Sequence, residues 1–169
     1  YEKRELQLNA LQSQINPHFL YNTLDNLIYL VEANETDKAT EMIASLSRFF
    51  RFITNREQFM ITLRDEFVFT KTYIKIMSYR FDNFECIWDV DEKVLKNKTV
   101  KLILQPVIEN AIHHGARKTK DMVTINISCK LIEEEIHLVV EDNAQGIGEE
   151  ELTIIKNQLS SVTLGKAGI

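Results

Sequence analysis

Several kinds of residue that mark specialised protein classes are scarce in this chain. Its two cysteines, Cys86 and Cys129, stand far apart and form no C-x-x-C pair, so neither a zinc ribbon nor a disulfide framework is predicted. No apolar run approaches the ~20 residues that span a bilayer, and no signal peptide opens the chain. Lys and Arg are scattered and the net charge is -5, which argues against a surface that binds nucleic acid. We therefore expect a soluble globular chain in a reducing cytoplasm.

Glycine is also scarce, and all of it lies late in the chain. The five glycines are Gly115, Gly146, Gly148, Gly165 and Gly168. Everything before Gly115 therefore lacks the residue that enters left-handed backbone conformations most readily. This asymmetry predicts a helical first part and a second part with loops of the nucleotide-binding type. With 169 residues and 44% hydrophobic content, the chain can fill the core of one ordinary domain or of two small ones.

In the first part, apolar residues recur at near-helical spacing. Their recurrence over residues 2–32 predicts a long amphipathic helix, and Pro17 predicts a bend around residues 13–17 because it removes one helical hydrogen bond. After a short turn, Thr36 is predicted to cap a second helix that continues to Ile53. The two helices form an antiparallel hairpin. Since such a hairpin cannot bury both apolar faces alone, we expect two copies to pair as a four-helix bundle in a homodimer.

A change in pattern near Phe59 divides the chain. The T-L-R-D sequence that begins at Thr62 has the form of a capping box and predicts a third helix to about Arg80. Beyond it, short alternating stretches replace the long helical periodicity. We therefore predict one domain over residues 1–58, the hairpin, and a second domain over residues 59–169.

The second domain is predicted to mix strands and helices. Strands are expected at residues 84–90, 123–127 and 136–140, the last two paired through a turn at residues 133–135. A helix over residues 100–114 lies between them and ends at Gly115. Its core-facing residues would be Leu102, Ile103, Val107, Ile108 and Ala111. The predicted class is α+β, with the helical hairpin followed by a two-layer α/β sandwich.

Three stretches place polar residues where chemistry can occur. Q-I-N-P-H-F-L-Y-N-T-L contains His18 and Asn22, L-Q-P-V-I-E-N-A-I-H-H-G contains Glu109 and Asn110, and D-N-A-Q-G-I-G begins at Asp142. By position alone, the first would be a surface histidine, the second a solvated helical amide and the third a turn loop. The adjacent histidines of the second stretch point about 100° apart on a helix, so they are not predicted to share a zinc ion.

In this order and at these separations, the three stretches resemble the H box, the N box and the first G box of the LytS/YehU-type sensor histidine kinases, whose ATP-binding domain has the GHKL (Bergerat) fold. The resemblance covers residues 11–169. It implies that His18 is the phosphoacceptor, because neutral imidazole is a good nucleophile near pH 7 and attacks the γ-phosphate of ATP. Asn22 is a candidate for orienting the ring or a hydrolytic water. No acid adjoins His18, so Glu109 is the candidate base.

The resemblance also implies residues that bind the nucleotide: Asn110, His113, His114, Asp142, Gly146 and Gly148. The amide of Asn110 would bind Mg²⁺ that bridges the triphosphate, since a hard cation takes an amide oxygen readily and keeps several waters. The two histidines would line the phosphate side. Asp142 would accept a hydrogen bond from the adenine amino group, and the glycines would let the backbone approach the nucleotide.

The chain departs from the family pattern at some of these positions. Pro106 stands where the water-splitting ATPases of the superfamily carry a glutamate, which favours phosphoryl transfer over hydrolysis. Many relatives carry a lysine at His113 and a glycine at Ala144. Residues 149–167 would be the ATP lid. Gly168 and Ile169 resemble the opening of a second G box, so we expect the fold to be incomplete at its C-terminal end.

Taken together, the resemblance implies the kinase core of a two-component sensor histidine kinase. This core would phosphorylate itself on His18 with ATP and Mg²⁺ and pass the phosphoryl group to an aspartate of a response regulator. It would act as a homodimer on the cytoplasmic side of the cell membrane, within a membrane-anchored protein. Two other classes remain open. One is a catalytically silent pseudokinase that serves as a dimerisation scaffold, which Ala144 and His113 slightly favour, and the other is a GHKL ATPase.

Overall fold

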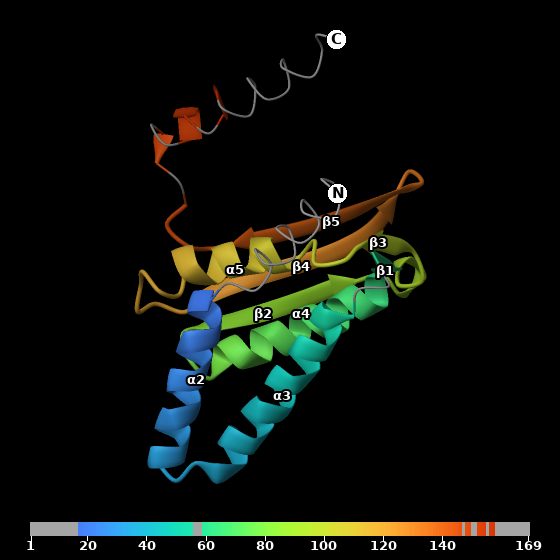
Figure 1. Ribbon diagram of the computed structural model, residues 1–169. Helices are drawn as coiled ribbons and strands as arrows, with labels where there is room; N and C mark the ends of the chain where they lie inside the picture. Colours follow the sequence, from blue (N-terminus) through green and yellow to red (C-terminus); the bar gives the residue numbers. More distant parts are fainter. Residues whose placement is uncertain (1–16, 56–58, 147, 150–151, 155, 158–169) are drawn as a thin grey trace, which may run out of the picture.

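The computed structural model describes residues 17–55, 59–146, 148–149, 152–154 and 156–157 (Figure 1). Its elements follow the order α2 (Pro17–Glu32), α3 (Thr36–Thr54), β1 (Met60–Thr62), α4 (Leu63–Ser78), β2 (Phe84–Val90), the 3-10 helix η1 (Glu92–Val94), β3 (Lys98–Val100), α5 (Gln105–His114), β4 (Val123–Ile132) and β5 (Glu135–Asp142). The chain is α+β, as predicted. Residues 2–16 of the helix predicted over residues 2–32, most of the bend predicted around residues 13–17 and most of the predicted lid lie outside the described residues.

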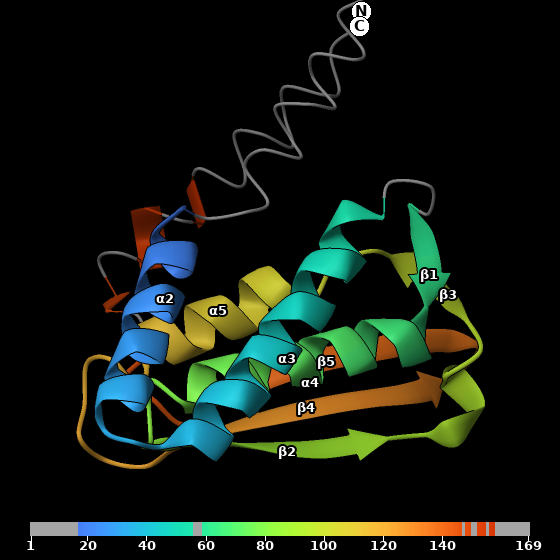
Figure 2. The same ribbon diagram turned by 60° about the horizontal axis from the view of Figure 1, so that its bottom comes forward.

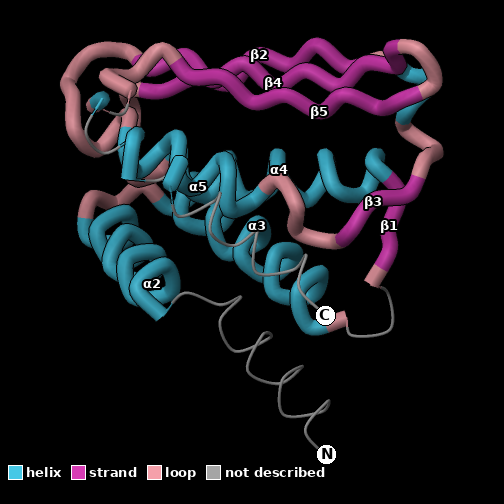
Figure 3. Tube along the Cα trace, turned by 90° about the horizontal axis from the view of Figure 1, so that it is seen from above, coloured by secondary structure: helices cyan, strands magenta, loops and turns pink. Residues whose placement is uncertain are grey.

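The larger sheet positions the rest of the molecule. Its three strands have the order β2-β4-β5, with β2 parallel to β4 and β4 antiparallel to β5. From Val123 to Cys129, every second side chain of β4 is buried: Val123, Ile125, Ile127 and Cys129. Figure 3 shows α2, α3, α4 and α5 on one side of this sheet, with α4 and α5 nearer to it. The core therefore lies between the sheet and this inner pair of helices.

The predicted strands are confirmed, with longer limits for two of them. β2 has the predicted bounds, whereas β4 continues to Ile132 and β5 spans Glu135–Asp142. Glu133 and Glu134 close the β4–β5 hairpin with φ angles of 47° and 70°. Two residues with positive φ are typical of the tight turn whose twist matches that of an antiparallel hairpin. None of the helices in the described ranges has the length and apolar content that a membrane crossing requires.

The predicted hairpin is present as α2 and α3, but Thr36 is not its capping residue. The carbonyl of Glu35 accepts the N–H of Ala39 at 2.9 Å, so Glu35 is the N-cap and Thr36 is the first helical residue. No side chain caps this end. Asn34, with a φ of 60°, reverses the chain just before it. The prediction placed the cap one residue too late. Threonine is a preferred capping residue, but the chain reversal at Asn34 lets the helix begin at Thr36, so the residue before it, Glu35, takes the N-cap position.

The hairpin packs against the second part of the chain through aromatic rings. Phe49 of α3 stacks on Phe69 of α4, with 5.0 Å between ring centroids, and Phe19 of α2 lies 5.1 Å from Phe49 and 5.5 Å from Tyr73. All four rings are buried. One apolar face of the hairpin is therefore covered within the chain. Other apolar side chains of the hairpin remain exposed: Tyr21, Leu24, Ile28, Tyr29, Val31 and Ile43.

The start of α4 confirms the predicted cap at Thr62. The Thr62 hydroxyl accepts the backbone N–H of Asp65 at 3.2 Å and donates to the Asp65 carboxylate at 2.6 Å. The Asp65 carboxylate thus accepts a hydrogen bond from the Thr62 hydroxyl. In the usual capping box it would instead accept one from the backbone N–H of the capping residue. The helix ends at Ser78, two residues before the predicted limit at Arg80.

The helix predicted over residues 100–114 begins later, at Gln105. Residues 98–100 form β3 instead, which pairs antiparallel with β1 so that Met60 lies opposite Val100. Pro106 occupies the first turn of α5, where a missing N–H costs no helical bond. With this start, Ile103 and Val107 are 45% and 47% exposed, so the prediction that they face the core is wrong. The other three predicted core residues are buried.

The segment before α5 is held by two charged side chains. Glu66 of α4 is fully buried, and its carboxylate accepts the backbone N–H groups of Leu102 and Leu104, each at 2.9 Å. Leu102 has a φ of 65°, an uncommon conformation for a non-glycine residue. The Lys101 ammonium donates to the carbonyl of Phe52 and, at 2.8 Å, to that of Asn55 at the end of α3. These contacts fix where α5 starts.

Candidate functional site

A cavity of about 440 Å³ lies between the start of α2 and the end of α5. It is lined by His18, Glu109, His113, His114, Arg117 and Lys118. Figures 1 and 2 both show the first turn of α2 beside the C-terminal end of α5. The structure therefore brings together four residues of the H-box and N-box stretches, which are far apart in the sequence.

The position of His18 follows from its neighbours on α2. Phe19 is 8% exposed and packs into the aromatic cluster, which fixes the first turn of the helix and leaves the His18 side chain exposed at the surface. The amide nitrogen of Asn22, one turn later, lies 2.9 Å from His18 Nδ1. Because an amide nitrogen only donates hydrogen bonds, Nδ1 accepts this one and the neutral ring carries its proton on Nε2. The orienting contact that the sequence suggested for Asn22 is thus present.

Glu109 and His113 lie one turn apart on the cavity side of α5. His113 Nε2 is 4.0 Å from Glu109 Oε1, and both side chains are about one-quarter exposed, at 22% and 25%. Burial lowers the pKa of His113 below its usual value, the Glu109 carboxylate raises it, and Arg80, Arg117 and His18 lower it further. The imidazole of His113 is therefore mainly neutral near pH 7, and Glu109 is the carboxylate of the cavity.

Arg117 and Lys118 were not predicted from the sequence as site residues. They follow Gly115 and Ala116, in a loop whose backbone bonds to the end of α5: Arg117 N–H donates to the carbonyl of Ile112 at 3.2 Å and Lys118 N–H donates to that of Gly115 at 2.9 Å. The Lys118 ammonium lies 3.2 Å from His114 Nδ1, so that nitrogen must accept. Two consecutive cations, one residue beyond the glycine that ends α5, were the available signal in the sequence.

Asn110 lies on α5 but not in the cavity. Its side chain is exposed, and it is not one of the lining residues. No group of three or more His, Cys, Asp or Glu side chains in the described part of the chain could hold a metal ion. A cation at Asn110 would therefore take most of its ligands from phosphate oxygens and water, which is how Mg²⁺ commonly binds.

The loop of the third stretch also lies outside the cavity. Asp142 ends β5, and its Oδ1 accepts the backbone N–H of Ala144 at 3.0 Å. The carboxamide of Asn143 accepts the N–H of Thr124 at 2.8 Å and anchors the loop to β4. Gly146 has a φ of 70°, a conformation that favours glycine, and Gly148 is exposed. Residues 142–144 are thus held by these bonds at the end of the sheet.

Gly115 joins the second and third stretches. Its N–H donates to the carbonyl of Ala111 at 2.8 Å, which ends α5 as predicted. A Cβ atom here would lie 2.6 Å from that carbonyl oxygen, 3.0 Å from Val123 and 3.2 Å from the Cβ of Ala144. Glycine is therefore required by close packing. Ala144 is accommodated in the G-box loop because its neighbour has no side chain.

Comparison with known proteins gives consistent matches. Residues 6–84 match the model of the family described as histidine kinase. The chain is 34% identical over 145 residues to the sensor histidine kinase YesM of Bacillus subtilis, which covers 85% of this chain and 25% of that protein. It is 32% identical over 151 residues to the sensor protein LytS of Enterococcus faecalis, with 87% and 25% covered. It is 28% identical over 159 residues to the sensor protein kinase HptS of Staphylococcus aureus, with 94% and 30% covered. The chain thus spans between 25% and 30% of the length of these relatives.

Proposed function

Because this chain belongs to the LytS-type sensor histidine kinases, we propose that it is the kinase core of such a protein and transfers the γ-phosphoryl group of ATP to His18. The observation that carries this proposal is the shared cavity. It is lined by an exposed histidine from the hairpin and by Glu109 and His113 from α5 of the same chain. A nucleophile, a base and a group that binds phosphate are the parts that phosphoryl transfer requires.

The ring nitrogens of His18 would have separate roles. Nδ1 accepts a hydrogen bond from Asn22 at 2.9 Å, so its lone pair is engaged, and Nε2 would be the nucleophile once its proton has been taken by a base. The bond between Nε2 and the γ-phosphorus forms as the bond between that phosphorus and the bridging oxygen breaks, and ADP leaves. As this bond forms, the carboxylate of Glu109 takes the Nε2 proton, which frees the Nε2 lone pair for the attack. Asn22 would be a positioning residue because it fixes the tautomer and the direction of the ring.

The nucleotide would lie along α5 and the G-box loop, in an ATP-binding domain of the GHKL fold over residues 59–169. This is supported by helices on one face of a mixed sheet and by the contact between Gly115 and Ala144 that joins the two stretches. Asn110 would hold Mg²⁺, which neutralises phosphate charge when bound. Asp142 would recognise adenine, Gly146 and Gly148 would admit the backbone to the nucleotide, and His113 with His114 would face the phosphates.

The hairpin would mediate homodimerisation. Its exposed apolar side chains, from Tyr21 to Ile43, form a surface with no cover in the described part of the chain. Two such surfaces buried against each other would make a four-helix bundle. We propose that the dimer passes its phosphoryl group to an aspartate of a response regulator, on the cytoplasmic side of a membrane-anchored sensor. These partners follow from the family resemblance.

Labelling with ATP that carries a radioactive γ-phosphate tests the proposal. The full-length protein should acquire a label that is acid-labile and base-stable, and His18→Gln should abolish it while ATP binding stays within a few-fold. His137→Gln is the matched control, since His137 is an exposed histidine on β5. Label retained in His18→Gln, or an acid-stable label, would refute the assignment. A protein that binds ATP without labelling would support the scaffold, and steady phosphate release without labelling would support a GHKL ATPase.

A further inference from the structure

The cavity that His18 lines has more cationic than anionic side chains. Of the other lining residues, Arg117 and Lys118 have cationic side chains, whereas Glu109 is the single carboxylate. A phosphoryl group on His18 would add a charge of about -1.5 to -2 at pH 7. It would also face the C-terminal end of α5, whose dipole disfavours negative charge. The phosphorylated state therefore needs cations more than the unmodified state does.

The two cations are carried by a loop that is fixed in position. The amide nitrogen of Asn83 donates to the carbonyls of Ala116 at 2.9 Å and of Thr119 at 2.8 Å, on either side of the pair. Ala116 is buried at 4% exposure. The backbone bonds of Arg117 and Lys118 to the end of α5 complete the support. Side chains on such a loop lose less conformational freedom when they bind an anion than side chains on an unsupported loop.

We propose that Arg117 and Lys118 form a cation pair that receives and holds the phosphoryl group once it is on His18, a role that rests on His18 being the phosphoacceptor. Arginine can donate two parallel hydrogen bonds to phosphoryl oxygens, and lysine supplies a compact charge. The pair stabilises the phosphorylated product. Its positive charge offsets the repulsion of the phosphoryl group by the Glu109 carboxylate and by the C-terminal end of α5.

The product state can be made without ATP. Phosphoramidate phosphorylates histidine: its N–P bond breaks, a new bond forms between the phosphorus and the ring nitrogen, and ammonia leaves with the ring proton. The phosphoryl group of phospho-His18 in the full-length protein is then titrated by ³¹P nuclear magnetic resonance, with His18→Gln to assign the signal. Its second pKa would ordinarily lie near about 6. Nearby cations favour the dianion and lower this pKa.

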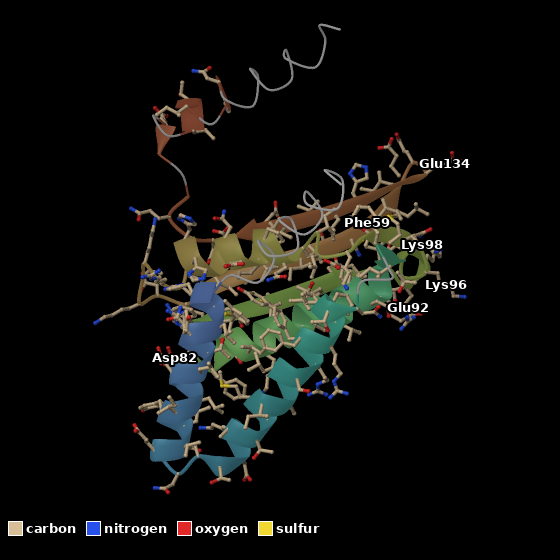
Figure 4. The ribbon with its side chains drawn as sticks, viewed as in Figure 1. Phe59, Asp82, Glu92, Lys96, Lys98 and Glu134 are labelled. Carbon is tan, nitrogen blue, oxygen red and sulfur yellow. The ribbon has the colours of Figure 1, made fainter. Side chains whose placement is uncertain are left out.

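The comparison is between the wild type and the double variant Arg117→Gln, Lys118→Gln. The acid dissociation constant of the phosphoryl group should be about tenfold larger in the wild type. Lys96→Gln, Lys98→Gln is the matched control, because both lysines are exposed and lie at the end of the molecule away from α2 (Figure 4). It should titrate like the wild type. Equal dissociation constants in the wild type and the Arg117, Lys118 variant would overturn the proposal.

Further arms separate the sources of phosphate and the two proposals. Loss of ATP affinity in the double variant, with an unchanged phosphohistidine titration, would assign the cations to the nucleotide and overturn the proposal. Failure of phosphoramidate to modify His18 while it modifies His137 would also contradict a cavity that accepts anions. A wild type that shows the tenfold effect but takes no label from ATP would support the cation pair and refute the proposed kinase activity.

Discussion

The two ends of α5 differ in how deeply their polar side chains are buried and in what those side chains contact. At its start, a fully buried carboxylate, Glu66, accepts two backbone N–H groups and supports the left-handed conformation of Leu102. At its end, Glu109 and His113 are partly exposed and line a cavity of about 440 Å³ with His18. The buried end encloses its polar groups within the protein, whereas the open end exposes them to a cavity. The helix is therefore anchored at the end where no chemistry is proposed, and the proposed chemistry lies at its partly exposed end.

The largest expected effect concerns whether the phosphoryl group is transferred within one subunit or between the two subunits of the dimer. Since His18 and Glu109 of one chain line one cavity, we predict that each subunit phosphorylates its own histidine. Heterodimers of a His18→Gln subunit and an Asn110→Asp subunit, purified through two different tags, should take up no more label from ATP than the Asn110→Asp homodimer. Strong labelling of the Asn110→Asp subunit would show transfer between subunits and contradict the arrangement.

At the buried end, Glu66→Ala should cost about 3–5 kcal/mol of the free energy of unfolding, because two buried N–H groups lose a charged acceptor. Urea denaturation measures it. Glu141→Ala is the matched control: Glu141 is an exposed glutamate on β5, and its loss should stay within about 0.5 kcal/mol. If the two substitutions had similar effects, the contrast between the ends of α5 would lose its energetic basis.

Gly115→Ala should cost about 1–3 kcal/mol, since the new Cβ would overpack a dense region. The closest clash, 2.6 Å, is with the carbonyl oxygen of Ala111, so Ala144→Gly should restore little of the loss. Gly148→Ala provides a control because a Cβ there would meet no atom within 4 Å. Thermal unfolding would measure all three variants. Full rescue by Ala144→Gly would show that the side-chain contact matters more than the backbone contact.

A smaller effect is expected from pH, with opposite sign at the two ends. Burial raises the pKa of Glu66, so the folded state holds its proton to higher pH than the unfolded state does. The stability that Glu66 contributes is therefore present below its unfolded pKa and lost as pH rises through the folded pKa. Burial lowers the pKa of His113, so its contribution is present above the unfolded pKa and lost as pH falls through the folded pKa.

Urea denaturation at a series of pH values, from acidic to neutral, separates the effect of Glu66 from that of His113. Relative to Glu66→Gln, the wild type should gain stability on acidification. Relative to His113→Gln, it should lose stability. Two differences of the same sign would contradict the assigned directions of the pKa shifts.

Local signals in the sequence predicted much of the fold. The alternation of residues 84–90 predicted β2 with its observed bounds, and the Thr62 cap predicted the start of α4. The start of α5 was missed because it depends on distant partners. Residues 98–100 pair with β1, and Glu66 holds the turn that follows. The sequence pattern of residues 98–105 predicts neither contact.

The candidate site was predicted in the same uneven way. His18, Glu109 and His113 were identified from motif resemblance, but that their side chains line one cavity follows from the packing of Phe19 against the aromatic cluster. Periodicity identified the apolar faces of the hairpin without identifying α4 as the partner of one of them. Arg117 and Lys118 belong to none of the three stretches, and only the position of their loop beside His18 makes them candidates.

The bonds of Lys101 have a mechanical consequence. This residue ties the carbonyls at the end of α3 to the backbone that enters α5, and the next residues are tied to Glu66. A twist of α3 must therefore either break the Lys101 bonds or displace the first turn of the helix that carries Glu109 and Asn110. The short segment from Lys101 to Leu104 therefore connects the end of α3 with the start of α5. A torque applied to the hairpin would reach α5 both through the Lys101 ammonium group and through the packing of α3 on α4, whose Glu66 bonds the same segment.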